Sequence, residues 1–150
     1  MKISILLPYK ENFTPIYAGA VSLFVKDTTK ISKFKKNITV YGNTNLKYIY
    51  TLPYKNIFLK KNLIQSGSKV YVNEFLKYEN KEPSNIIEIH NRPNYFHLVH
   101  NKIKTQKVVL YFHNDPLTMT GSRSKTDRIK ILDNASKIIF NSHWSRKRFL

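Results

Sequence analysis

Short apolar runs alternate along this chain with segments in which apolar residues recur at helical spacing. The first run, Ile3 to Pro8, is continuous and closed by proline, which is typical of a strand buried on both faces of a parallel sheet. After a loop from Tyr9 to Pro15, apolar residues return three or four positions apart, with charged residues on the other side. These apolar positions are Ile16, Ala20, Leu23, Phe24 and Ile31. The chain is therefore predicted to begin with a strand, a loop and a helix.

The middle of the chain gives weaker signals. Residues 37–41 predict a strand closed by glycine and asparagine, and residues 47–52 predict a further strand closed by proline. The mixed pattern of residues 54–67 predicts neither a helix nor a strand. Residues 70–78 predict a helix, followed by a polar connection over residues 79–84.

The last third of the chain predicts three successive strand–helix units. The strands are residues 86–90, 108–112 and 137–140, and the helices are residues 95–102, 126–135 and 144–150. Two helix starts carry capping signals, because Ser124 stands three residues before Asp127 and Ser142 is placed as an N-cap. Alternation of this kind predicts an α/β fold, a doubly wound parallel sheet with helices on both faces.

Length and composition limit the possible classes of protein. A chain of 150 residues with 41% hydrophobic content suits one domain with a core of its own. No apolar stretch approaches the roughly 18 residues of a membrane-spanning helix, and the start of the chain does not read as a secretory signal. The absence of cysteine excludes disulfides. We therefore expect a cytoplasmic protein.

The charge changes this picture, because 26 Lys and Arg against 9 Asp and Glu give a net charge of +17. An excess of this size predicts an anionic partner, which could be a nucleic acid, a phosphorylated ligand or an anionic membrane surface. Two basic clusters with interleaved aromatics, residues 30–36 and 54–61, are the candidates for membrane contact. An ordinary solvated basic face is the alternative interpretation.

Two similar polar turns follow predicted strands, His90 to Pro93 and His113 to Pro116. Each combines an imidazole and an amide with a charged side chain, and such groups bind hydroxyls or phosphates and transfer protons. Ligands of open parallel sheets bind at the carboxyl ends of the strands, and consecutive strands are usually neighbours. The two turns are therefore expected to lie side by side in one site. Hydrophilic turns closed by proline are the alternative, in which Asp115 simply caps the following turn.

Other candidate ligand groups are weaker. Gly19, before the predicted first helix, would let a phosphate approach the backbone, although helix–strand packing explains a single glycine equally well. The glycine-rich dinucleotide fingerprint is absent. His97 and His100 lack a third ligand at a recognisable spacing, so no metal site is predicted.

Taken together, these segments resemble the GT-B glycosyltransferases of family 4, which use nucleotide-sugar donors and usually retain anomeric configuration. The resemblance covers nearly the whole chain, and the paired His-Asn turns are most similar to bacterial enzymes of lipopolysaccharide-core assembly, some of which transfer mannose. It rests on residues 3–8, the Gly19 turn, residues 87–93, residues 111–119 and residues 138–142. In this family two Rossmann-like domains face each other across a cleft. The resemblance implies that residues 1–150 are the amino-terminal, acceptor-side domain.

The resemblance also implies roles for the turn residues. The expected catalytic residues are His113 and Asp115; the donor-binding residues are Gly19, Ala20 and Ser142; the acceptor-binding residues are His90, Asn91, Arg92 and Asn114. The implied partners are a nucleotide-sugar co-substrate, with no further cofactor, and a saccharide or lipid-linked acceptor at the inner face of the cytoplasmic membrane. The family often has paired glycines in its first loop, whereas Ala18 precedes Gly19 here.

The chain ends within a predicted helix, so we expect a longer protein that carries the donor domain, and residues 1–150 alone are expected to be inactive. Two other classes remain open. A basic α/β nucleic-acid-binding module would use the charge and the aromatic residues, although no known nucleic-acid motif is present and no nucleic acid is expected. A noncatalytic sugar-binding or scaffolding domain is the third possibility.

Overall fold

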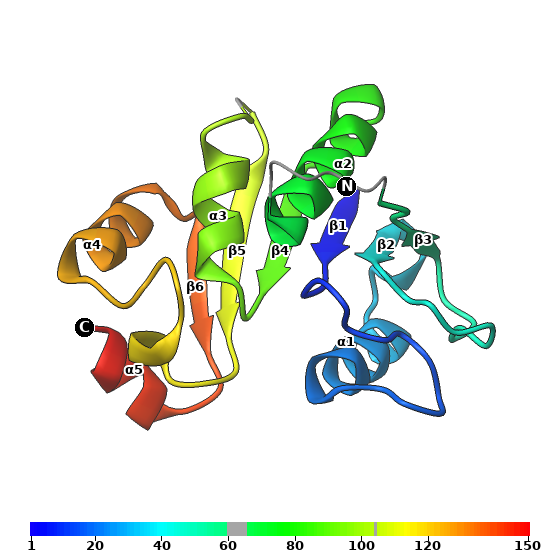
Figure 1. Cartoon of the computed structure of the whole chain (residues 1–150), viewed down its shortest axis with the longest axis horizontal. Coiled ribbons are helices and arrows are strands. Elements are labelled where there is room, and N and C mark those ends of the chain that lie inside the picture. The colour runs from blue at the N-terminus through cyan, green and yellow to red at the C-terminus, as the bar shows by residue number, and fades with distance from the viewer. Residues whose placement is uncertain (60–65, 104) are drawn as a thin grey trace.

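The centre of the molecule is a sheet of six parallel strands in the order β3-β2-β1-β4-β5-β6 (Figure 1). The structure is a computed structural model, and it describes residues 1–59, 66–103 and 105–150. The strands are β1 (Ile3–Leu6), β2 (Ile38–Gly42), β3 (Tyr54–Asn56), β4 (Ile86–His90), β5 (Lys107–Phe112) and β6 (Lys137–Phe140). The order changes direction at β1, as in a Rossmann-like fold. The predicted α/β class is confirmed.

Helices cover both faces of this sheet. They are α1 (Ala20–Ile31), α2 (Gly67–Lys81), α3 (Pro93–His100), α4 (Lys125–Asn134) and α5 (His143–Phe149), with short 3-10 turns η1 (Lys35–Asn37) and η2 (Pro116–Thr118). Because side chains alternate along a strand, Ile5 of β1 packs with Val25 of α1, whereas Leu6 joins the opposite cluster with Phe75 of α2 and Phe96 of α3. The fold is therefore doubly wound.

The third strand differs from the sequence prediction. Residues 47–52 were expected to form it, but β3 is Tyr54–Asn56 and pairs with Val40 to Gly42. A strand parallel to β2 must start at the same end of the sheet, so the chain after Gly42 has to travel back along the sheet first. Residues 47–52 are used in this return. Tyr54 then anchors the strand, because its ring stacks on Phe13 at 5.2 Å.

The first helix begins later than its apolar spacing predicted. It starts at Ala20 after Gly19, so Ile16 lies outside it and is exposed. The buried side of α1 is formed by Val21 and Val25, whereas Ile31 at its end is 84% exposed. Apolar spacing indicated a helix correctly, but the face that the sheet covers is set by how the helix lies on β1 and β2.

Helix α2 extends beyond its predicted end into the segment predicted as a polar connection. Glu79 is fully buried and accepts hydrogen bonds from the Ser4 hydroxyl of β1 and from the backbone N–H and hydroxyl of Ser84. A buried carboxyl group needs such partners, since an unpartnered one is costly. Glu79 therefore attaches α2 to β1.

The capping predictions for the last helices are confirmed. The Ser124 hydroxyl accepts a hydrogen bond from the N–H of Asp127 at the start of α4, and Ser142 caps α5 through the N–H of Ser145. No helix in the described part of the chain is long and apolar enough to span a membrane.

Candidate functional site

The polar turns gather at the edge of the sheet where the parallel strands end (Figure 1). The Gly19 loop follows β1, the His90 turn follows β4, the His113 turn follows β5, and Asn141 and Ser142 follow β6. The strand order reverses between β1 and β4, which is where ligands of such sheets usually bind.

The two histidine turns meet, as predicted. Strands β4 and β5 are neighbours, and Nδ1 of His90 lies 3.0 Å from Nε2 of His113. This distance is that of a hydrogen bond between the two imidazoles. Residues 23 positions apart in sequence therefore form one polar pair.

Asn91 joins the turns through its side chain and backbone. Its Oδ1 accepts hydrogen bonds from the N–H groups of His113 and Asn114, each at 3.3 Å, and its own N–H donates to the Tyr111 carbonyl. Asn91 has a φ of 56°, a left-handed conformation that asparagine tolerates better than most residues. The predicted acceptor-binding residues Asn91 and Asn114 are thus brought together, with the Asn91 oxygen used within the protein.

Aromatic rings hold the imidazole pair in place. Tyr111 stacks on His90 with centroids 5.1 Å apart and on His113 at 4.9 Å. Phe24, one turn after the start of α1, meets the His113 ring edge-on at 4.9 Å. The pair is therefore fixed between a strand and a helix.

Burial keeps both histidines neutral near pH 7. It lowers the pKa of His90 to about 3, with a smaller contribution from the charge of His113, and it also lowers the pKa of His113. On the same face of β4, burial raises the pKa of Glu88. A neutral imidazole can accept a hydrogen bond at one nitrogen and donate one at the other.

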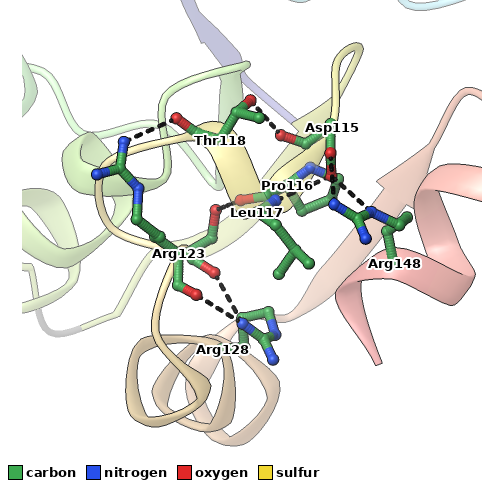
Figure 2. A network of polar contacts seen from close by, with 8 residues as sticks. Asp115, Pro116, Leu117, Thr118, Arg123, Arg128 and Arg148 are labelled. Atoms are coloured by element: carbon green, nitrogen blue, oxygen red, sulfur yellow. Dashed lines mark hydrogen bonds and ion pairs between the residues drawn. The ribbon is translucent and has the colours of Figure 1, made fainter.

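Asp115 is held by structural contacts (Figure 2). Its side chain accepts the N–H of Leu117 at 3.0 Å, as the N-cap of η2, and forms an ion pair with Arg148 of α5 at 3.0 Å. The adjacent Arg148 guanidinium is the main cause of the lowered pKa of Asp115. The alternative interpretation of Asp115 as a turn cap thus describes its contacts, and its catalytic role stays a prediction.

A pocket of about 310 Å³ opens beside the histidine turns. Its lining includes the predicted acceptor-binding residues Asn91 and Arg92, with Ser68, Asn94, Thr118 and Thr120. The Arg92 guanidinium donates to the carbonyl of Asn91 at 2.8 Å, which holds the side chain near this pocket. Hydroxyl, amide and guanidinium groups of this kind suit a polyhydroxylated or anionic ligand.

Gly121 packs closely on Pro93 and Asn94, two residues that line this pocket, and sequence patterns did not indicate it. Its φ is 93°, and a Cβ there would lie 2.5 Å from the backbone nitrogen of Asn94. Only glycine permits this approach of the loop after η2 to the start of α3. His97 reinforces it by placing Nε2 2.8 Å from the Gly121 carbonyl.

The predicted donor-binding residues Gly19 and Ala20 stand at the start of α1. Space above Gly19 is filled by the Glu11 carboxylate, which a Cβ at Gly19 would overlap. The same carboxylate accepts the N–H of Ser22 at 3.1 Å and so occupies the helix N-terminus. A phosphate that binds here would have to displace Glu11.

Ser142 lies beside the histidine turns through its neighbour Asn141, whose amide donates to the His113 carbonyl at 2.7 Å. The Ser142 hydroxyl itself is hydrogen-bonded within α5, to Ser145. A hollow of about 380 Å³ is lined by Asn141, Ser142 and Arg146. This hollow is open to a ligand at the outer end of the sheet.

Of the remaining histidines, His97 and His100 have structural contacts, and His143 is exposed at the start of α5. His100 stacks on Phe96, and no group of three or more His, Cys, Asp or Glu within residues 1–59, 66–103 and 105–150 could hold a metal ion.

No protein-family model and no curated protein matches this chain. The site itself is therefore the basis for inferring its chemistry. It consists of a pair of neutral imidazoles and a neighbouring pocket lined by hydrogen-bonding groups. Glu88 is the group that the sequence prediction left without a role. The sequence could have indicated this residue, because Glu88 stands two positions before His90 and side chains two positions apart lie on the same face of a strand.

Proposed function

We propose that this chain is the acceptor-side domain of a GT-B glycosyltransferase that moves a sugar, such as mannose, from a nucleotide-sugar donor to a saccharide or lipid-linked acceptor. The single observation that carries the proposal is the contact between His90 and His113 beside the pocket that Asn91 and Arg92 line. The Rossmann-like sheet order, together with the resemblance of these turns to family 4 enzymes, supports it.

In this proposal His113 contacts the sugar that is transferred. It is half-buried, neutral near pH 7 and hydrogen-bonded to His90, so it can bind a hydroxyl group or hold a proton near the reacting bond. Arg92 and Asn94 bind the acceptor in the pocket. A donor domain beyond residues 1–150 completes the site, and the Glu11 carboxylate moves when the donor phosphates reach Gly19.

The burial of aromatic residues favours this proposal over a nucleic-acid-binding module. Stacking on bases requires accessible rings. Eight of the 20 aromatic residues are instead buried in the core: Phe13, Tyr41, Tyr71, Phe75, Tyr95, Phe96, Phe112 and Phe149.

The two basic clusters differ in the surroundings of their described residues. Residues 30–36 precede β2 and stand at its amino end, whereas residues 57–59 follow β3 and stand at its carboxyl end. Lys60 and Lys61 of the second cluster lie outside the described residues. Lys55, the described lysine of the second cluster, lies within β3 and forms an ion pair with Glu82 at 3.5 Å. Lysines 30, 33, 35 and 36 of the first cluster are exposed. A membrane contact is therefore proposed for the first cluster.

Saccharide binding to the purified chain tests the proposal. Oligosaccharides with and without mannose are titrated into the ¹⁵N-labelled protein, and backbone signals of Asn91, Arg92, Asn94 and Thr118 are expected to shift. His113→Ala should weaken binding, whereas His100→Ala, which changes a histidine that stacks on Phe96 and belongs to neither histidine turn, should not. Saturating saccharide that moves none of these signals would contradict the proposal.

Sugar transfer tests the catalytic role. In a protein that carries these residues with a donor domain, His113→Ala is expected to lower the transfer rate by about a hundredfold or more with the fold retained. The 150-residue chain alone is expected to show no transfer. Undiminished transfer by His113→Ala would remove His113 from the mechanism.

A further inference from the structure

Glu88 is a carboxyl group on β4 of a chain whose net charge is +17. It lies on β4 in the floor of a pocket of about 270 Å³, where Phe24 of α1 and Tyr111 of β5 also contribute to the lining. Within the described residues, no lysine or arginine forms an ion pair with it. It lies close to His90, with Glu88 Oε1 3.9 Å from His90 Nε2.

That nitrogen of His90 is itself buried and has no hydrogen-bond partner in the part of the chain that the structure describes. A separation of 3.9 Å exceeds a hydrogen bond, so the carboxylate acts on it through its charge. If Nε2 were unprotonated, its lone pair would be a buried acceptor without a donor and would face the negatively charged Glu88 oxygen. Both effects are unfavourable. An N–H on Nε2 is attracted instead.

A proton on Nε2 of His90 determines which nitrogen donates and which accepts in the contact between the two histidines. His90 is neutral and carries one ring proton, so its Nδ1 must be the acceptor in the 3.0 Å contact with His113. Nε2 of His113 is then the donor. The other nitrogen of His113, Nδ1, is left unprotonated. It has no hydrogen-bond partner within the described residues and is not one of the buried unpartnered atoms.

We propose that Glu88 and His90 are positioning residues that place the proton of His113 on Nε2, so that Nδ1 accepts a hydrogen bond from a hydroxyl group of the ligand. Tyr111 and Phe24 keep the rings in the geometry that this requires. The ligand class rests on the proposed function, whereas the proton arrangement does not.

The proton arrangement is tested by ¹H–¹⁵N correlation spectra of the histidine rings in the ligand-free chain near pH 7. We expect Nε2 of both His90 and His113 to be protonated and Nδ1 of both to be unprotonated. A proton on Nδ1 of His113 in the unmodified protein would overturn the proposal, whatever the variants do.

Variants then test Glu88. Glu88→Gln should shift His113 toward the other tautomer, and Glu88→Asp, which keeps the charge, should largely restore the original one. Glu74→Gln is the control, because it removes one negative charge from an exposed pair with Lys77 on α2. An unchanged tautomer in a folded Glu88→Gln variant would exclude Glu88 from the role.

Saccharide binding separates the two proposals. Where the tautomer is as expected, a bound saccharide should shift the Nδ1 signal of His113 more than its Nε2 signal. The expected tautomer with no saccharide binding would overturn the proposed function and leave the positioning role in place. Binding with the reverse tautomer would overturn the positioning role alone.

Discussion

The site depends on residues whose protonation is decided by burial. The His90 ring is covered by the rings of Tyr111, Phe24 and His113, and the Glu88 carboxylate lies 3.9 Å from its Nε2. A desolvated imidazole loses its proton readily, which keeps it neutral and able to accept a hydrogen bond. Among the individual residues, the property that matters is therefore which ring nitrogen of each histidine carries the proton, because neither ring is charged near pH 7.

The lowered pKa of His90 predicts how stability depends on pH. The unfolded chain takes up a proton at His90 below about pH 6.5, whereas the folded protein does so only near pH 3. The free energy of unfolding should therefore decrease as the pH is lowered through this window. His90 alone should account for a decrease of about 2 kcal/mol from pH 7 to pH 5. The lowered pKa of His113 acts in the same direction and the raised pKa of Glu88 in the opposite one.

Urea unfolding at several pH values measures this dependence. A His90→Phe variant, which keeps a ring in the stack, should be less stable at pH 7 and should lose much of the slope between pH 7 and pH 5. A slope equal to that of the unmodified protein would show that other groups cause it.

At the scale of elements, the loops of the site are held by contacts between segments that are distant in sequence. Gly121 packs on the start of α3, Arg148 of α5 binds Asp115, and Asn91 joins the ends of β4 and β5. Helix α2, whose first turn contributes Ser68 to the pocket, is attached at its other end by Glu79. The pocket walls are thus set by how helices are fixed to the sheet.

Glu79→Ala is expected to lower the free energy of unfolding by about 3 kcal/mol, because the Ser4 and Ser84 donors lose their acceptor in a buried place. Glu74→Ala, on the same helix but in an exposed pair with Lys77, should change it by less than about 0.5 kcal/mol. Chemical unfolding of both variants measures the difference. Equal losses would contradict the role of Glu79.

At the scale of the whole molecule, the charge opposes the compact state. A net charge of +17 on 150 residues means that exposed cations repel one another at low salt. The exposed lysines 30, 33, 35 and 36 lie between the last turn of α1 and η1. Repulsion here is relieved by salt or by an anionic surface.

Stability should therefore rise with ionic strength, as the screening length falls from roughly 30 Å at 0.01 M to about 8 Å at 0.15 M. Replacing the four lysines by glutamine should raise the urea midpoint at low salt and flatten its salt dependence. Thermal or urea unfolding across this range measures both effects. An identical salt dependence in the variant would show that this cluster does not contribute.

The sequence by itself determined the features that depend on local periodicity and on short-range capping. Apolar runs and helical spacing predicted an α/β parallel sheet, Ser124 and Ser142 predicted helix starts, and two consecutive strand–helix units predicted that the His90 and His113 turns lie side by side. These follow from the repeats of strand and helix geometry, which each short segment carries alone.

The tertiary structure decided everything that depends on packing between distant segments. It placed the third strand at Tyr54–Asn56, buried Glu79, filled the space above Gly19 with Glu11, and set Glu88 beside His90 with no lysine or arginine paired to it among the described residues. No local pattern contains these facts, because burial and charge pairing arise only when separate elements come into contact. The polar turns were visible in the sequence, whereas the protonation of their histidines was not.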